Sequence, residues 1–485
     1  MSPNVSYFNH NSRDAPRGPV KNICCIGAGY VGGPTCAVLA WKCPDIKVTI
    51  TDISEERIAA WNSEELPIFE PGLDAVVKEA RGRNLFFSTD VDGSIAAADL
   101  IFVSVNTPTK EAGIGAGLAA DLCYVEAATR RIATVSKKGA IIVEKSTVPC
   151  RTAESMRKIL EAVSPSTDAS FEILSNPEFL AEGTAIEDLL DPARVLIGAM
   201  PTPGGQLAQQ RLAEVYARWV RPEAIITMGL WSSELSKLAA NALLAQRVSS
   251  INAIAAICEK TEANVHEVSS ACRLDLRIGS KFLEAGVGFG GSCFQKDLQN
   301  LIYLSLSLGL PEVAEYWKQV LVMNAWTKRR FSKDIVQKMF STITSKHIAV
   351  LGFAFKADTG DTREAPAIDV CRDLLEDGAV VHIYDPKVSE ASIDRALMAK
   401  GACSHTATKG KGYIVEPSMQ QACAGASALV FMTNWTEFSS KQVDWKAIYQ
   451  SMSKPAFIFD GRNVVKDVEA LKKIGFSVYK SGVGY

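Results

Sequence analysis

Short runs of apolar and β-branched residues alternate with helix-like stretches from residue 21 onward. Continuous apolar runs of this kind are typical of parallel strands, because helices cover such strands on both faces. In the first half of the chain the runs predict strands at residues 22–27, 47–52, 99–106, 140–146 and 171–177. A second series predicts strands at residues 347–356, 380–386, 428–435 and 456–462. The chain is therefore predicted to be an α/β protein with two Rossmann-like domains, each built on a parallel sheet.

A long helix separates the two series of strands. Residues 231–261 contain neither Pro nor Gly, are rich in Ala and Leu, and carry serines near their start that can cap a helix. Residues 311–340 predict further helix. We expect a central helical domain whose long helix is a strut and an oligomer contact. The predicted organisation is a disordered extension at 1–20, an α/β domain at 21–229, a helical domain at 230–345 and a second α/β domain at 346–485.

Composition narrows the class of protein. The 485 residues are 47% hydrophobic and carry a net charge of −2, so no general field attracts nucleic acid or an anionic membrane. The chain has no run of eighteen apolar residues, and its polar first twenty residues lack the apolar core of a signal peptide. Its twelve cysteines form no C-x-x-C, which is typical of reduced thiols in a cytoplasmic protein. None of the five histidines falls in a motif, so we expect no metal site.

The first predicted strand leads into a glycine motif. Gly27-x-Gly29-x-x-Gly32 opens a helix, and the second strand ends at Asp52, twenty residues after Gly32. This context is typical of a dinucleotide site, where glycines admit the pyrophosphate to the helix N-terminus and the carboxylate binds the ribose. A carboxylate repels a 2′-phosphate, which favours NAD over NADP, although Arg57 nearby could serve a phosphate. The predicted cofactor residues here are Gly27, Ala28, Gly29, Tyr30, Val31, Gly32, Asp52 and Arg57.

The stretch "GVGFGGSCFQKD" at 286–297 places Cys293 after four glycines and at a predicted helix start. The positive field of a helix N-terminus favours a thiolate, but a buried structural cysteine is an equally good interpretation of this stretch alone. Together with NAD, a reactive thiol indicates aldehyde oxidation through a thiohemiacetal and a thioester. Lys237 and Asn241 share one face of the long helix and could serve that site. A surface salt bridge is the commoner role for an isolated lysine.

Eight motifs then resemble one known family: "GAGYVGGPT" (27–35), "VNTPT" (105–109), "EKSTVP" (144–149), "SNPEFLAEGTA" (175–185), "SSELSKLAANA" (232–242), "GFGGSCFQKD" (288–297), "GFAFKADTGDTRE" (352–364) and "FDGR" (459–462). Their order and spacing are similar to those of the UDP-glucose 6-dehydrogenases, in the UDP-glucose/GDP-mannose dehydrogenase family. The resemblance extends from about residue 21 to 480. It is closer to the animal-type members than to the shorter bacterial ones.

The resemblance implies a four-electron oxidation of UDP-glucose to UDP-glucuronate with two NAD and one water. The first α/β domain would bind NAD, the helical domain would dimerise, and the last domain would bind the UDP-sugar. Cys293 would be the nucleophile, while Lys237 and Asp297 would manage protons and the oxyanion. Asn241 would hold the sugar.

Other positions match family residues around the reacting groups. Thr147 and Glu178 match positions for water placement and thioester hydrolysis. The implied cofactor contacts are Val105, Asn106, Thr107, Pro108, Thr109, Ser146, Thr147, Val148, Glu182 and Arg363. The implied substrate contacts are Glu178, Phe179, Leu180, Ala181, Glu182, Lys237, Asn241, Arg277, Lys281, Phe282, Gly290, Phe355, Lys356 and Arg462. In the family the equivalent of Arg277 reaches across a dimer contact, and animal-type members form hexamers inhibited by UDP-xylose.

Three other functions remain open at this point. A sister enzyme acting on GDP-mannose or a UDP-N-acetylhexosamine would use the same Cys and Lys. A hydroxyacid dehydrogenase would pair a Rossmann domain with a long helix, but it needs no thiol and no third domain. An NAD-binding regulator would need no intact set of Lys237, Asn241, Cys293 and Asp297, and all four are present.

Overall fold

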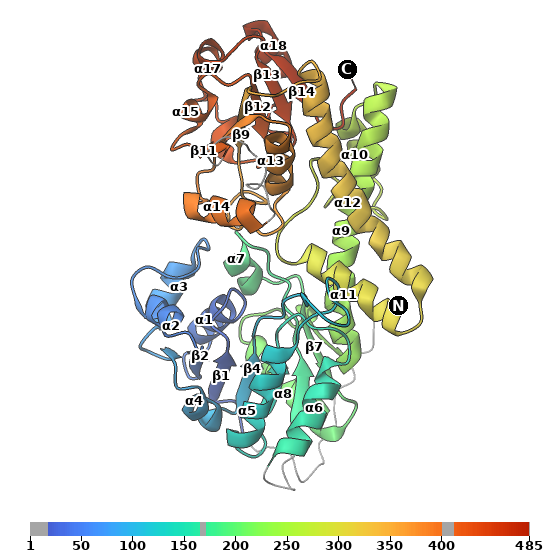
Figure 1. Ribbon diagram of the computed structural model, residues 1–485. Helices are drawn as coiled ribbons and strands as arrows, with labels where there is room; N and C mark the ends of the chain where they lie inside the picture. The colour runs from blue at the N-terminus through green and yellow to red at the C-terminus, as the bar shows by residue number, and fades with distance from the viewer. Residues whose placement is uncertain (1–17, 165–170, 400–411, 485) are drawn as a thin grey trace. The chain divides into compact units, whose positions relative to one another are not determined.

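The computed structural model describes residues 18–164, 171–399 and 412–484 (Figure 1). The predicted extension at 1–20 therefore lies almost wholly outside the described residues. The chain forms two compact units, of which the first extends to Leu238 and the second begins at Ala239. Within the described ranges, no helix combines the length and hydrophobicity needed to cross a bilayer.

The first unit contains an eight-stranded sheet in the order β3-β2-β1-β4-β5-β6-β7-β8. Its strands are β1 (Asn22–Ile26), β2 (Lys47–Thr51), β3 (Leu85–Ser88), β4 (Leu100–Val103), β5 (Ile141–Glu144), β6 (Glu172–Ser175), β7 (Val195–Ala199) and β8 (Ile225–Gly229). Its helices are α1 (Gly32–Lys42), α2 (Glu55–Asn62), α3 (Leu73–Ala80), α4 (Val91–Ala97), α5 (Cys123–Val135), α6 (Thr152–Val163), α7 (Ala185–Leu190), α8 (Pro203–Tyr216) and a 3-10 turn at Pro222–Ala224.

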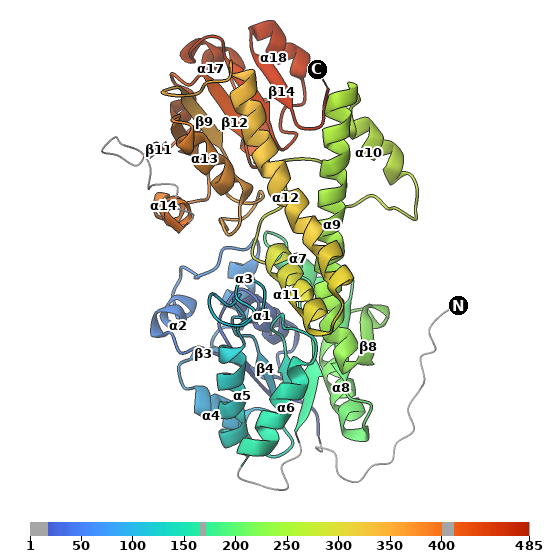
Figure 2. The ribbon, with the colours of Figure 1, turned by 45° about the vertical axis from the view of Figure 1, so that its right-hand side comes forward.

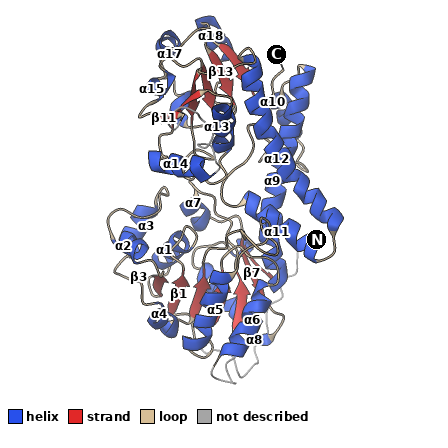
Figure 3. Cartoon of the chain, viewed as in Figure 1, coloured by secondary structure: helices blue, strands red, loops and turns tan. Residues whose placement is uncertain are grey.

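Alternate residues of the central strand β1 enter separate cores on the two faces of this sheet. Ile23 and Cys25 pack with α1, α3, α7 and α8, whereas Cys24 and Ile26 pack with α4, α5 and α6. Helices therefore cover both faces, as the continuous apolar runs predicted (Figure 3). Neighbouring strands pair in parallel except β6 and β7, which pair antiparallel. The order of the strands reverses between β1 and β4, which pair in parallel, and dinucleotides bind at the carboxyl ends of strands at such a point.

The long helix α9 (Leu230–Thr261) contains 32 residues and begins directly after β8. It agrees with the predicted helix at 231–261. Its C-terminal part belongs to the second unit, together with α10 (Val265–Arg273), α11 (Phe294–Ser307) and α12 (Pro311–Lys338). Apolar side chains of α9, α11 and α12 pack together, including Ala242, Leu298 and Val320. Figures 1 and 2 show α12 running beside this part of α9.

The second unit also contains a parallel six-stranded sheet in the order β11-β10-β9-β12-β13-β14. Its strands are β9 (His347–Leu351), β10 (Val380–Tyr384), β11 (Tyr413–Val415), β12 (Ala428–Phe431), β13 (Phe457–Asp460) and β14 (Ser477–Lys480). Its helices are α13 (Pro366–Glu376), α14 (Glu390–Ala399), α15 (Met419–Cys423), α16 (Thr436–Ser439), α17 (Trp445–Ser451) and α18 (Val468–Ile474). The strand order reverses between β9 and β12, so this sheet offers a second binding edge. Two Rossmann-like sheets and a helical centre confirm the predicted fold class.

Candidate active site

The turn after β1 has the geometry that the glycine motif predicted. Gly27 has φ +107°, and a Cβ there would lie 2.2 Å from the carbonyl oxygen of Ser104, which follows β4. A Cβ on Gly32 would lie 2.2 Å from the carbonyl oxygen of Gly27, so α1 can start this close only with glycine. A Cβ on Gly29 would meet nothing within 4 Å. The protein itself does not require glycine there, and the open space fits the close approach of a pyrophosphate.

The Asp52 carboxylate lies at the end of β2 and is only 8% exposed. It accepts hydrogen bonds from the backbone N–H groups of Ala28 and Ser54, both at 3.0 Å, and an ion pair from Arg57 at 3.0 Å. Burial raises the pKa of Asp52, but these donors outweigh it and hold the pKa below its usual range. Arg57, considered from the sequence as a phosphate ligand, is thus paired with the carboxylate that excludes a phosphate.

The two loops predicted to contact the cofactor are tied to each other. Ser146 donates a hydrogen bond to the Val105 carbonyl at 2.7 Å, and Thr107 donates one to the Thr147 carbonyl at 2.8 Å. These loops follow β4, which pairs with β1, and β5, which pairs with β4. The structure therefore gathers the predicted cofactor residues of the first unit at one edge, and this donor set fits a dinucleotide.

Glu178 lies in the loop after β6. Its carboxylate is 2.8 Å from the ammonium of Lys145, and the backbone N–H groups of Phe179 and Leu180 donate to it at 2.7 and 3.1 Å. Lys145 also donates to the side-chain carbonyl of Asn176 at 3.1 Å. Sequence reasoning gave Lys145 no role. A lysine directly after a fully buried strand was the available signal, because a buried ammonium needs a partner.

The Lys237 side chain is buried and lies 5.1 Å from the centre of the Phe179 ring. Arg194 lies over the same ring at 4.0 Å. A surface salt bridge is thus the wrong interpretation of Lys237. Its ammonium instead faces the loop that carries Glu178. Burial raises the pKa of the Glu178 carboxyl, Lys145 lowers it, and Lys237 lowers it by a smaller amount.

A buried carboxylate, Glu70, holds the start of α7 behind this loop. It accepts the backbone N–H groups of Gly183 at 2.6 Å and Ala185 at 3.1 Å. The sequence gave no local sign of this pairing, because more than a hundred residues separate the partners.

In the second unit, Cys293 is the residue that precedes α11, and its thiol is exposed. Its Sγ lies 3.5 Å from the hydroxyl of Ser292. One turn later, Asp297 is buried and accepts a hydrogen bond of 2.6 Å from the side-chain amide of Asn241 on α9. The sequence suggested Lys237 or water as the partner of Asp297, and that pairing stays a prediction. The interpretation of Cys293 as a buried structural thiol is wrong.

Two predicted nucleotide-sugar residues of the second unit, Arg462 and Phe355, meet where the strand order of its sheet reverses. Arg462 follows β13 and donates to the backbone carbonyls of Met432 at 2.9 Å and Phe355 at 3.4 Å. A Cβ on Gly286 would lie 3.6 Å from the Arg462 guanidinium, so the glycine loop passes close to this cation. Asp460 fixes the turn, because it accepts the N–H groups of Arg462, Val464 and Val465.

Three other predicted contact residues have partners of their own. Arg277 pairs with Asp275 at 2.6 Å, and 90% of its side chain is exposed. Phe282 is exposed and lies 6.3 Å from the ring of Phe294, next to Cys293. Arg363 pairs with Asp361 at 2.7 Å.

Comparisons with known proteins agree with this arrangement. Three models of the UDP-glucose/GDP-mannose dehydrogenase family match the chain: the NAD binding domain at residues 21–220, the central domain at 231–326 and the UDP binding domain at 349–467. UDP-glucose 6-dehydrogenase 5 of Oryza sativa subsp. japonica is 60% identical over 468 residues, which cover 95% of this chain and 96% of the rice protein. UDP-glucose 6-dehydrogenase 1 of Glycine max is 58% identical with the same coverage.

Solved structures give the same result. A UDP-glucose dehydrogenase from the archaeon Pyrobaculum islandicum has a TM-score of 0.80 and 29% identity, and the match covers 98% of this chain and all of that one. A UDP-D-ManNAc dehydrogenase from Pyrococcus horikoshii has a TM-score of 0.77 and 26% identity, covering 95% and 99% of the two chains. The relatives named here come from plants and archaea, and the closeness to animal-type members stays a prediction. The chain belongs to the UDP-glucose/GDP-mannose dehydrogenase family of NAD-dependent enzymes.

Proposed function

We propose that the protein oxidises UDP-glucose to UDP-glucuronate with two NAD and one water. The observation that carries the proposal is the exposed Cys293 thiol at the start of α11, in a chain about 60% identical to UDP-glucose 6-dehydrogenases. NAD, when bound, would supply the hydride acceptor for each of the two oxidations. The glycine turn after β1 and Asp52 would hold it, with the paired loops at 105–109 and 146–148 beside it.

The second oxidation requires the thiol. Oxidation of the C6 alcohol gives an aldehyde, and the Cys293 thiolate adds to it to form a thiohemiacetal. Loss of the second hydride leaves a thioester, and water then cleaves the carbon–sulfur bond to give the carboxylate and the free thiol. We assign the oxyanion and the proton transfers to Lys237 and Asp297. Asn241 holds the sugar and, through its bond to Asp297, fixes that carboxylate.

Glu178 and Thr147 would place the hydrolytic water. Because Lys145 holds Glu178 as a carboxylate, Glu178 is suited to orient a water or to accept its proton, and not to donate one. Arg462 and Lys356 would bind the diphosphate, which is negative and needs fixed positive donors. The exposed Arg277 would exchange its ion pair with Asp275 for a substrate held by a second copy of the chain.

Assembly as a dimer through α9 is part of the proposal. The helix exposes Leu235, Leu243, Ile254 and Ile257, and the segment after α10 exposes Leu274 and Leu276. So many apolar side chains on one helix and its neighbour favour burial against a second copy. A hexamer inhibited by UDP-xylose is the further assembly we propose. The described cysteines are all free thiols, and we propose the cytoplasm as the compartment.

Counting NADH against sugar consumed tests the function. Purified protein should form two NADH for each UDP-glucose and far less with GDP-mannose or a UDP-N-acetylhexosamine. One NADH per sugar would indicate a single-step alcohol dehydrogenase. No NADH would indicate a regulator, and a preference for another sugar would identify a sister enzyme.

A further inference from the structure

The glycine loop that leads to Cys293 is held by two buried asparagines on different helices. Asn324 of α12 is 3% exposed, and its side chain makes a paired contact with the backbone of Phe289. Its oxygen accepts the Phe289 N–H at 2.8 Å, and its amide donates to the Phe289 carbonyl at 3.1 Å. Asn252 of α9 is 1% exposed, and its oxygen accepts the Gly286 N–H at 2.8 Å.

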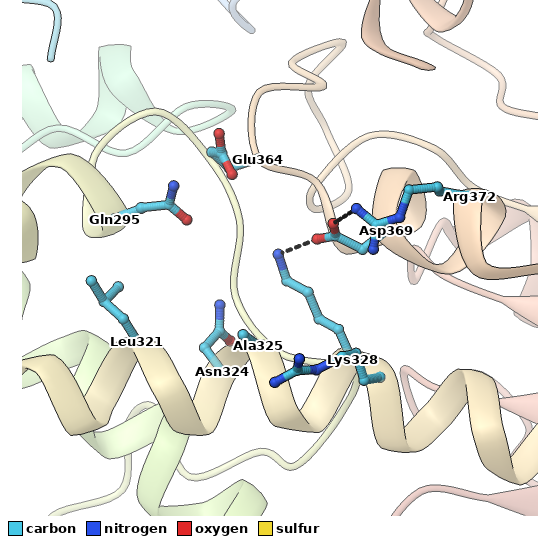
Figure 4. A pocket seen from close by; sticks show the side chains of 9 residues that line it. Gln295, Leu321, Asn324, Ala325, Lys328, Glu364, Asp369 and Arg372 are labelled. Atoms are coloured by element: carbon cyan, nitrogen blue, oxygen red, sulfur yellow. Dashed lines mark hydrogen bonds and ion pairs between the residues drawn. The ribbon is translucent and has the colours of Figure 1, made fainter. Parts of the chain in front are cut away.

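The loop is shaped to receive the Asn324 amide. Gly288 has φ +100°, and a Cβ there would lie 2.5 Å from the Asn324 oxygen. The side chain rises from α12 beside Ala325 and Lys328 and lines a cavity of about 260 Å³ that Gln295 and Glu364 also line (Figure 4). Two further backbone bonds fix the loop, from Val287 to the Gly461 carbonyl at 3.1 Å and from Gly291 to the Arg363 carbonyl at 2.8 Å.

We propose that Asn324 is a positioning residue for the Cys293 thiol and that Asn252 supports it. Glycine-rich backbone gains the most conformational freedom when a contact is lost, and four glycines precede Cys293. The Asn324 side chain satisfies both polar groups of one loop residue, so it fixes the direction of the chain as it enters α11. The same loop passes Arg462, so Asn324 also couples the thiol to the nucleotide-sugar site. This inference rests on the proposed function.

Asn324→Ala removes both bonds and leaves the N–H and carbonyl of Phe289 unpaired in a buried place. We expect the rate of the overall oxidation to fall on the order of 10- to 100-fold, because a small displacement of a reacting atom has an effect of this size. The affinity for NAD should stay within about two-fold, since the dinucleotide turn is in the other unit. Reduction of the UDP-6-aldehyde by NADH, which forms no bond to sulfur, should be affected much less than the overall oxidation.

A second variant separates positioning from a general loss of structure. In Asn324→Asp the charged carboxylate repels the Phe289 carbonyl, but the protonated carboxyl can accept and donate as the amide does. Burial raises the pKa of such a carboxyl. The activity of N324D relative to the wild type should therefore rise as the pH falls from about 8 to about 6. The activity of N324A relative to the wild type should not change over this pH range.

Thr327→Ala is the matched control on the same helix. Thr327 is 2% exposed and donates to the Met323 carbonyl of α12 itself at 2.8 Å. T327A should keep full activity at a similar thermal unfolding midpoint. A flat pH ratio for N324D, or equal losses of oxidation and aldehyde reduction in N324A, would overturn the positioning role. A wild-type protein that forms no NADH from any nucleotide sugar would instead refute the proposed function.

Discussion

The ammonium of Lys145 lies 2.8 Å from the carboxylate of Glu178, and only 4% and 14% of these side chains are exposed. Tyr216 and Lys145 both bond to the Asn176 side chain, so the pair is embedded in a buried polar group. Burial alone would raise the pKa of Glu178, but Lys145 and the N–H of Phe179 keep it below its usual range. Breaking such a pair from one side leaves a buried charge without compensation. The pair therefore sets both the charge of Glu178 and part of the stability of the first unit.

Lys145→Met should raise the pKa of Glu178, because burial then acts without an opposing cation. In the wild type the pKa of Glu178 is lower in the folded protein than in the unfolded chain. Glu178 therefore stabilises the fold at pH values above its pKa in the unfolded chain, and this stabilisation is lost as the pH falls through its pKa in the folded protein. In K145M the pKa of Glu178 is higher in the folded protein than in the unfolded chain, which reverses the pH dependence. The stability of K145M should therefore fall as the pH rises above the pKa of Glu178 in the unfolded chain. The difference from wild type should grow by about 1.4 kcal/mol for each unit by which the pKa of Glu178 rises.

Urea unfolding at pH 5 and pH 8 measures this effect. The midpoint of K145M should lie below that of the wild type at both pH values, and further below it at pH 8. Lys158→Met is the control, since Lys158 forms an exposed i,i+4 pair with Glu154 at 3.3 Å, and such pairs contribute little. A K145M midpoint no more sensitive to pH than that of K158M would show that Lys145 does not control Glu178.

Asp52→Ala should relax the discrimination against NADP. The substitution removes the repulsive carboxylate and also releases the Arg57 guanidinium, which now pairs with it at 3.0 Å. The ratio of kcat/KM for NADP to that for NAD should rise about ten-fold or more, equivalent to 1.4 kcal/mol or more of differential binding.

The double variant D52A/R57A tests the part played by Arg57. It should lose much of the gain with NADP, because no cation is left to meet the 2′-phosphate. Arg57→Ala alone should leave the preference for NAD in place. If D52A left the cofactor ratio unchanged, Asp52 would not be the ribose ligand.

The sequence predicted the parts of this molecule that depend on neighbours along the chain. Most residues of the runs at 22–27 and 47–52 are buried in strands, and the glycine turn between strand and helix follows from local sterics. The sequence did not predict β8 and the short β11. Both lie at a sheet edge, where strands are partly exposed and lack a continuous apolar run. The apolar run at β7 is a strand signal that the sequence does contain. Such a run does not indicate which way the strand points, so the antiparallel pairing of β7 with β6 could not be predicted.

The same distinction between local signals and long-range packing applies to the site residues. Cys293 and the glycine motif stand out because their neighbours are unusual. Lys145 with Glu178, and Asn324 with Phe289, are partners 33 and 35 residues apart. Only the packing of separate elements brings them together, so no spacing rule indicates them.

A charge placed on the exposed face of α9 should disrupt the proposed dimer. Leu243 is 52% exposed and Ile257 is 58% exposed on this helix. If a second copy covers them, Leu243→Asp or Ile257→Lys would bury an unpaired charge, at a cost of several kcal/mol. Light scattering should then show a shift to the monomer mass with loss of activity.

Met398→Lys is the control for this experiment. Met398 of α14 is 56% exposed, so M398K replaces an apolar side chain of similar exposure to Leu243 and Ile257 by a charged one. M398K should keep the mass and activity of the wild type. A wild-type protein that is an active monomer would rule out the dimer, and unchanged mass in both α9 variants would place the interface elsewhere.

Cys293→Ala should stop net formation of UDP-glucuronate, because no thioester can form without the thiol. NAD and UDP-glucose should still bind, since neither the turn after β1 nor Arg462 is altered. Supplied with the UDP-6-aldehyde and NADH, the variant should still reduce the aldehyde, a step that needs no bond to sulfur. Cys123→Ala is the control, because Cys123 is also an exposed thiol, at the start of α5. C123A should give two NADH per sugar. The same yield from C293A would mean that Cys293 forms no covalent intermediate and that the acid is made by another route, such as direct oxidation of a hydrated aldehyde.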